Sequence, residues 1–133
     1  MASIRRETVV QAPPAQVWDA MRDVGAIHRR LVRGFVTDCR MDGDDARVVT
    51  FVNGITAREV IVDVDDAQRR VVWSARSERL VHHNASLQAF DEGGATRIVW
   101  IADLLPDAMA QPISAMVEQG LAAMKRTLEA RGL

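Results

Sequence analysis

The last stretch of the chain, residues 112–133, has the clearest helical pattern of apolar and polar positions. Apolar side chains recur every three or four residues and would share one face of a helix, whereas most charged side chains fall elsewhere. This apolar stripe consists of Ile113, Met116, Val117, Gly120, Leu121, Met124 and Leu128. Pro112 suits the first helical turn, and Gly132 suits the position after the last one. The pattern predicts one long helix with one buried face, preceded by a separate turn over residues 107–111.

The rest of the chain reads mainly as strands that end at turn residues. An opening strand is predicted over residues 4–10, followed by two short helices near residues 14–22 and 26–30. Six further strands are predicted over residues 31–41, 46–52, 55–64, 69–75, 80–90 and 96–104. This order predicts a single α+β domain over residues 1–133, in which an antiparallel sheet packs one face on the terminal helix. A sheet that curves around one helix can enclose a cavity between the two layers.

Apolar and polar positions alternate in the predicted strand 80–90. Its odd-numbered face carries Val81, His83, Ala85, Leu87 and Ala89. His82 and His83 would point to opposite faces, so the two histidines do not form a metal site. A lone histidine on an apolar face is most often structural, but His83 is the titratable group that this periodicity places inside.

Three other strand positions stay open on periodicity alone. Trp73 is predicted to point inward, either as a core side chain or as a flat cavity wall. In strand 55–64 the pattern favours the face of Arg58, Val60, Val62 and Val64 as the inner one. In strand 96–104 the face of Trp100 competes with the face of Val99 and Ile101, and a bulge in either strand would change the answer.

Composition narrows the class of protein. The chain has 133 residues, of which 48% are hydrophobic, enough to bury a core without disulfides or metals. A formal charge of -1 argues against nucleic acid or an anionic membrane as the partner. Cys39 is the one cysteine and is interpreted as an inert core thiol in a reducing compartment. Without an apolar run suited to a signal peptide or a bilayer span, we expect a cytoplasmic protein with no membrane insertion.

Candidate chemistry is sparse. Tyrosine is absent, so the groups that orient a ligand must come from other polar residues. The chain has no nucleophile motif, no phosphate-binding glycine loop and no metal-ligand spacing. We therefore assign no catalytic residue and expect neither a metal nor a cofactor.

Several segments, taken in order, carry a family resemblance. They are residues 12–18 followed by 23–26, Arg58-Glu59 followed by residues 62–66, and residues 100–103 before Pro106. Together they resemble the START-like helix-grip superfamily, and within it the bacterial polyketide cyclase/dehydrase-type (SRPBCC) proteins, to which the plant abscisic-acid receptors are related. The resemblance covers nearly the whole chain and implies a seven-stranded curved sheet gripping the terminal helix around an apolar pocket.

The resemblance also implies pocket positions. Glu59 matches an acidic pocket residue of the receptors, Trp73 an aromatic one and His83 a polar one. The resemblance therefore implies that the Glu59 face of strand 55–64 points inward, whereas the periodicity of that strand favours the opposite face. By the same comparison Val99, rather than Trp100, would face the pocket, so the facing of strand 96–104 stays open. Residues 53–57 and 77–80 lie where the receptors have their gate and latch loops. The proline of the gate, the histidine of the latch and the tyrosine that matches His83 are absent, so hormone-receptor behaviour is not implied.

The leading hypothesis is binding of a small apolar or amphipathic ligand, such as a lipid, a polyketide-like molecule or an isoprenoid, between sheet and helix. The expected ligand-binding residues are Glu59, Trp73, His83, Ala85, Ile113, Val117, Gly120, Leu121 and Met124. One alternative is a polyketide cyclase or dehydratase that uses His83 and Glu59 for acid/base work. Another is a protein-interaction module with a filled core. A monomer and a homodimer are both compatible with the sequence.

Overall fold

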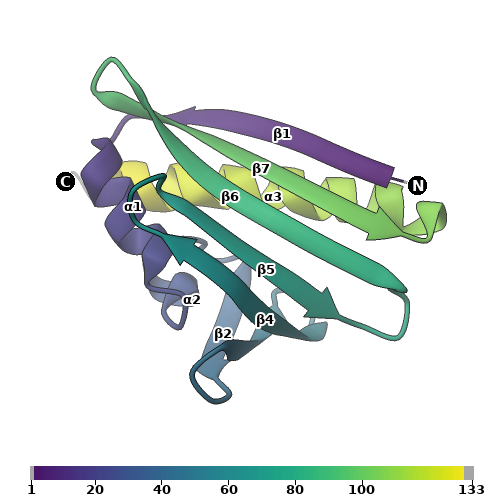
Figure 1. Ribbon diagram of the computed structural model, residues 1–133. Helices are drawn as coiled ribbons and strands as arrows, with labels where there is room; N and C mark the ends of the chain where they lie inside the picture. Colours follow the sequence, from purple (N-terminus) through teal and green to yellow (C-terminus); the bar gives the residue numbers. More distant parts are fainter. Residues whose placement is uncertain (1, 131–133) are drawn as a thin grey trace.

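The computed structural model describes residues 2–130, which form a curved sheet wrapped against a long helix (Figure 1). The strands of this part of the chain are β1 (Ala2–Val10), β2 (Val36–Met41), β3 (Ala46–Phe51), β4 (Thr56–Asp65), β5 (Arg70–Arg76), β6 (His82–Glu92) and β7 (Ala95–Leu105). The helical elements are α1 (Pro14–Arg22), α2 (Ile27–Arg30), the 3-10 turn η1 (Asp107–Met109) and α3 (Ala110–Ala130). The predicted α+β, helix-grip architecture is confirmed.

The sheet is antiparallel throughout, with the strand order β1-β7-β6-β5-β4-β3-β2. Strands β2 to β7 follow one another as a meander, and β1 joins the far edge beside β7. In Figure 1, α3 lies behind the sheet and runs along β7 and β1, while α1 and α2 sit at one end. The layer between α3 and the strands is therefore where a core or a cavity can form.

Helix α3 turns one side toward the sheet. Its buried residues are Val117, Gly120, Leu121, Ala123, Met124, Thr127 and Leu128, which largely continue the predicted apolar stripe. The helix begins at Ala110, two residues before Pro112, because residues 110–111 continue directly from η1. Gly132 lies outside the described residues. None of the described helices combines the length and the apolar character needed to cross a membrane.

One predicted strand starts later than the pattern suggested. Residues 31–35 are not extended: Val32 N–H donates to the carbonyl of Ile27 at 2.8 Å, and Phe35 N–H donates to the carbonyl of Val32 at 3.1 Å. These turns continue from α2, so β2 begins only at Val36. The apolar side chains of Leu31, Val32 and Phe35 are nevertheless buried, because the turns direct them into the core.

Before the bulge, the inner face of β4 is the face of Glu59, so the periodicity-based prediction is wrong for Arg58, Val60 and Val62, whereas Val64 packs against the core as predicted. Ile61 is opposite Trp73 and Asp63 is opposite Val72, so Val62 is an extra residue without a partner in β5. Such a bulge switches the facing of the residues that follow it. Val62 is 59% exposed and Glu59 only 7%.

Strand β7 turns Trp100 toward α3. The buried side chains of Ile98, Ala102 and Leu104 share this face through strict alternation. Val99, the position favoured by the family resemblance, is directed to the other face of the sheet and is opposite Glu7 of β1. The facing of this strand, which the sequence leaves open, is decided by the structure: Trp100, not Val99, faces α3.

Candidate functional site

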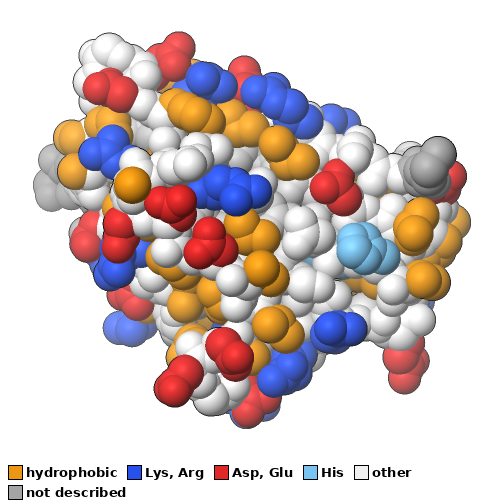
Figure 2. All heavy atoms as spheres, in the orientation of Figure 1, with side chains coloured by type: hydrophobic (Ala, Val, Ile, Leu, Met, Phe, Trp, Pro, Cys, Tyr) orange, Lys and Arg blue, Asp and Glu red, His pale blue; other side chains and the backbone are white. Residues whose placement is uncertain are grey.

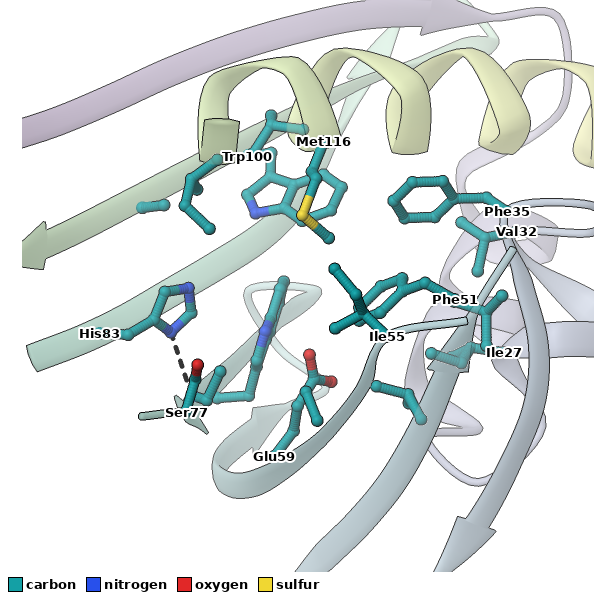
Figure 3. A pocket seen from close by; sticks show the side chains of 18 of the residues that line it. Ile27, Val32, Phe35, Phe51, Ile55, Glu59, Ser77, His83, Trp100 and Met116 are labelled. Atoms are coloured by element: carbon teal, nitrogen blue, oxygen red, sulfur yellow. Dashed lines mark hydrogen bonds between the residues drawn. The ribbon is translucent and has the colours of Figure 1, made fainter. Parts of the chain in front are cut away.

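A cavity of about 610 Å³ lies between the sheet and α3. Its wall is mostly apolar and comes from α2, the turn before β2, strands β3 to β7, and α3. Figure 3 shows Met116 reaching into it from α3, with Phe35, Phe51 and Ile55 on one side and His83 on the other. Its volume falls in the range of ordinary small-molecule sites.

Six of the nine expected site residues line this cavity. They are Glu59, Trp73, His83, Ile113, Val117 and Met124. The other three are buried but do not reach the cavity. Ala85 is directly opposite Trp73 in the sheet and belongs to the hydrophobic core. Leu121 packs within the hydrophobic core.

Gly120 is separated from the cavity by the Trp100 ring. A β-carbon at this position would lie 2.6 Å from Cζ3 of Trp100 and 3.4 Å from Cε2 of Phe35. The glycine therefore allows the indole to lie flat against α3, which accounts for its presence inside a helix. Its role is close packing rather than contact with a ligand.

Arg47 is a site residue that the sequence reasoning missed. Its side chain is buried, and its Nε and Nη2 atoms both lie 2.8 Å from Oε1 of Glu59. Its Nη1 donates to the carbonyl of Val24 at 2.9 Å, and its guanidinium carbon lies 5.7 Å from the centroid of the Trp73 ring. Arg47 thus fixes the Glu59 carboxylate and supports the indole of Trp73 at the cavity wall.

A signal for Arg47 was present in the sequence. The β3–β4 turn is built on Asn53, whose Oδ1 accepts from Ile55 N–H at 3.0 Å, and on Gly54, whose φ of 88° suits glycine. Arg47 and Glu59 are equally distant from Asn53 along the chain, and the hairpin pairs them. A register centred on Asn53 would have predicted this contact.

His83 is held by the backbone of β5. Its Nδ1 accepts a hydrogen bond from Ala75 N–H at 3.0 Å, and its carbonyl accepts one from Ser74 Oγ at 2.6 Å. Burial lowers the pKa of the imidazole, and the nearby Glu59 carboxylate opposes that shift. A neutral imidazole whose Nδ1 accepts must carry its proton on Nε2. His83 therefore presents an N–H donor toward the cavity that it lines.

Two tryptophans form the floor beside these polar groups. The Trp73 and Trp100 rings meet edge to face, with centroids 5.7 Å apart and planes inclined at 62°. The Trp100 Nε1 atom is buried and has no hydrogen-bond partner within the described chain. The pair gives the cavity a largely apolar aromatic surface.

Two loops border the cavity at its rim. The β3–β4 loop contributes Ile55, the start of β4 contributes Thr56 and Ala57, and the β5–β6 loop contributes residues 77–80. Ile55 is 53% exposed, although its side chain reaches the cavity (Figure 3). These are the loops that the family resemblance placed at the gate and latch positions.

Away from the cavity, the outer surface carries mixed charge. Figure 2 shows basic, acidic and apolar side chains interspersed over the face of the sheet that is turned away from α3. Among residues 2–130 no group of three His, Cys, Asp or Glu side chains is placed to hold a metal ion. The cavity is thus the feature of the described chain with the clearest functional character.

Comparisons with known proteins agree with this geometry. Residues 1–129 match a family described as polyketide cyclase / dehydrase and lipid transport. No curated protein matches the chain at a significant level.

Many solved structures share the fold. The protein XoxI from Bacillus cereus is 15% identical with a TM-score of 0.86, and the match covers 100% of this chain and 99% of that one. A protein from Thermobifida fusca is 24% identical with a TM-score of 0.74, covering 98% and 91%. The di-domain ARO/CYC protein BexL from the BE-7585A biosynthetic pathway is 14% identical with a TM-score of 0.78, covering 97% and 47%. At these identities the likeness shows the fold alone.

Proposed function

Because the chain belongs to the polyketide cyclase / dehydrase and lipid transport family, we propose that it binds one apolar or amphipathic small molecule between α3 and the sheet. Lipids, isoprenoids and polyketide-like ring systems are the ligand classes that suit this site. The observation that carries the proposal is the cavity of about 610 Å³, whose wall is apolar except for a few placed polar groups. The open volume also argues against the filled-core interaction module.

The proposed ligand-binding residues are Glu59, Trp73, His83, Ile113, Val117 and Met124, to which we add Arg47, Trp100 and Met116 because they line the same cavity. The apolar members would supply most of the binding free energy through burial. Arg47, Glu59 and His83 would orient the polar part of the ligand, since hydrogen bonds within an apolar cavity are directional and strong.

The test is to fill the cavity from α3. Met116→Trp places a larger side chain in the cavity, whereas Gln119→Trp places the same side chain on the exposed side of the same helix. We expect the wild-type chain and Gln119→Trp to retain an apolar molecule in native mass spectrometry and to bind the dye ANS. Met116→Trp should lose both. Equal ANS binding by both variants, with no retained molecule in any sample, would reject the proposal.

A second candidate function is catalysis of a cyclisation or dehydration. The observation that favours it is that a carboxylate from Glu59 and an imidazole N–H from His83 line the same apolar cavity. In such a reaction the carboxylate would take a proton from the carbon next to a ketone, and the N–H would bind the enolate oxygen. We rank it second because Oε1 of Glu59 is already engaged by Arg47.

Turnover separates the two candidates. A β-diketone that closes by intramolecular aldol condensation can be followed by its change in ultraviolet absorbance. Catalysis requires saturable acceleration over buffer that is lost in His83→Asn but kept in His82→Asn. Binding of the diketone without acceleration of its reaction would reject catalysis and support the binding function only.

A further inference from the structure

We propose that the ligand carries both a hydrogen-bond donor and an acceptor at one end: a hydroxyl that donates to Oε2 of Glu59 and a carbonyl-type oxygen that accepts from Nε2–H of His83. This inference rests on the proposed function, because it specifies the chemical class of ligand for the same cavity. The class is a neutral hydroxy-carbonyl compound with an apolar body.

The Nε2–H donor of His83 follows from the hydrogen bond that its Nδ1 atom accepts. A backbone N–H can only donate, so the bond from Ala75 N–H at 3.0 Å requires Nδ1 to accept. The single proton of the neutral ring then lies on Nε2. The residue is 9% exposed, and Nε2 makes no hydrogen bond to any residue in the range 2–130. An N–H at the wall of an apolar cavity, without a partner in the described chain, favours a ligand that brings an acceptor.

The Oε2 acceptor of Glu59 follows from the fact that Arg47 contacts only the other carboxylate oxygen, Oε1. Both guanidinium nitrogens that approach the carboxylate do so at Oε1. Oε2 accepts no hydrogen bond from the described residues, although the side chain is only 10% exposed. A carboxylate oxygen at the cavity wall can only accept, so the matching group on a ligand is a hydroxyl.

Nε2 of His83 and Oε2 of Glu59 belong to one part of the wall. Glu59 and Ala75 are directly opposite each other in β4 and β5, and Ala75 binds the ring of His83. Figure 3 shows Glu59 and His83 directed into the same space, with Ile27, Val32 and Phe35 at the other side of the cavity. A ligand would thus place its polar end against β4 and β6 and its apolar body toward α2.

The same contacts select against a carboxylic acid. The Arg47 guanidinium already donates to Glu59 and to the carbonyl of Val24. A ligand carboxylate placed there would bring a second negative charge beside Glu59, whereas Arg79, the other cation that lines the cavity, lies in the β5–β6 loop. A fatty-acid head group is therefore a poor fit at the Glu59 position.

The test uses probes that share one rigid three-ring body. Fluorene has no polar group, 9-fluorenone has the acceptor, 2-hydroxyfluorene has the donor, and 2-hydroxy-9-fluorenone has both. 9-Fluorenone-2-carboxylic acid supplies the anionic comparison. Equilibrium dialysis with chromatographic quantification gives each Kd. We expect each matched polar group to improve affinity roughly fivefold over fluorene, with 2-hydroxy-9-fluorenone the tightest and the acid no tighter than fluorene.

Two variants assign the groups. In His83→Asn the side-chain oxygen can still accept from Ala75 N–H, but the Nε2 donor is gone, so the preference for 9-fluorenone over fluorene should vanish. His82→Asn changes the neighbouring exposed histidine and should leave every Kd unchanged. The double variant Arg47→Met with Glu59→Leu removes the ion pair as a unit, which avoids an unpaired buried charge. It should lose the preference for 2-hydroxyfluorene while still binding fluorene.

The outcomes separate this inference from the function on which it rests. Equal affinity for the four uncharged probes would overturn the donor–acceptor assignment and leave ligand binding intact. A carbonyl preference that survives in His83→Asn would overturn the role of His83. No binding of any probe or of ANS would reject the proposed function and this inference with it.

Discussion

Arg47 and Glu59 form an ion pair across β3 and β4 that lies almost entirely inside the protein. Their side chains are 6% and 10% exposed, and two guanidinium nitrogens lie 2.8 Å from one carboxylate oxygen. A third guanidinium nitrogen binds the carbonyl of Val24, so the pair connects the sheet with the segment between α1 and α2. Removal of both charges from water is costly, and each residue is stabilised mainly by the other.

This arrangement predicts strong non-additivity in stability. Arg47→Met or Glu59→Leu alone should lower the free energy of unfolding by about 3–5 kcal/mol, because each leaves an unpaired buried charge. The double variant should fall within about 2 kcal/mol of the wild-type chain, since an apolar pair replaces an ionic one. Urea unfolding at pH 7 measures all four proteins. Additive losses in the double variant would contradict the pairing.

The buried imidazole of His83 predicts a pH dependence of stability. Burial lowers its pKa in the folded chain, so on acidification through the ordinary value near 6.5 the unfolded chain binds a proton that the folded chain does not. Stability from this group is therefore fully present above about pH 6.5. It declines as the pH falls toward the lowered folded-state pKa, by about 1.4 kcal/mol per pH unit at most.

Unfolding curves between pH 7.5 and pH 5 test this point. The slope due to His83 should disappear in His83→Asn and persist in the control His82→Asn. Nitrogen NMR of the imidazole provides an independent measurement, with the proton expected on Nε2 at pH 7. A proton on Nδ1 would be incompatible with the hydrogen bond from Ala75 N–H.

Gly120→Ala should destabilise the protein, although alanine is the better helix former by about 1 kcal/mol. The new methyl group would lie 2.6 Å from the Trp100 ring, which would have to shift toward the cavity. We expect a net loss of about 1–2 kcal/mol in unfolding free energy, typical of an overpacked site. In a Trp100→Leu background the cost of Gly120→Ala should largely disappear, because the ring that the methyl group would meet is absent. A neutral or stabilising Gly120→Ala in the wild-type background would show that the contact is looser than described.

Cys39 should be inert in the folded protein. It is 7% exposed, and burial raises the pKa of its thiol, so little reactive thiolate is present at neutral pH. Titration with a chromogenic disulfide reagent at pH 7.5 should label almost no thiol in the native state. One thiol per chain should react in denaturant, and rapid native labelling would refute the core assignment.

Local pattern was sufficient for the elements and for part of the site. The spacing from Ile113 to Leu128 predicted the long helix, because the direction of each side chain in a helix depends only on the local backbone. Alternation in β6 placed His83 and His82 on opposite faces for the same reason, and the structure gives 9% exposure for the former and an exposed side chain for the latter. Turn residues such as Asn53-Gly54 located the ends of the strands.

Other features depended on contacts between distant parts of the chain. The bulge at Val62 is defined by pairing with β5, so the periodicity of β4 alone selected the wrong face. Both faces of β7 carry apolar residues, so the sequence did not show which face points inward; in the structure Trp100 faces the cavity. Arg47 was recognised as a site residue only through its contact with Glu59. The open volume depends on how far α3 stands from the sheet. A sequence pattern reports the direction of each side chain relative to its own backbone, whereas strand register and the spacing of layers are set by packing between residues far apart in the chain.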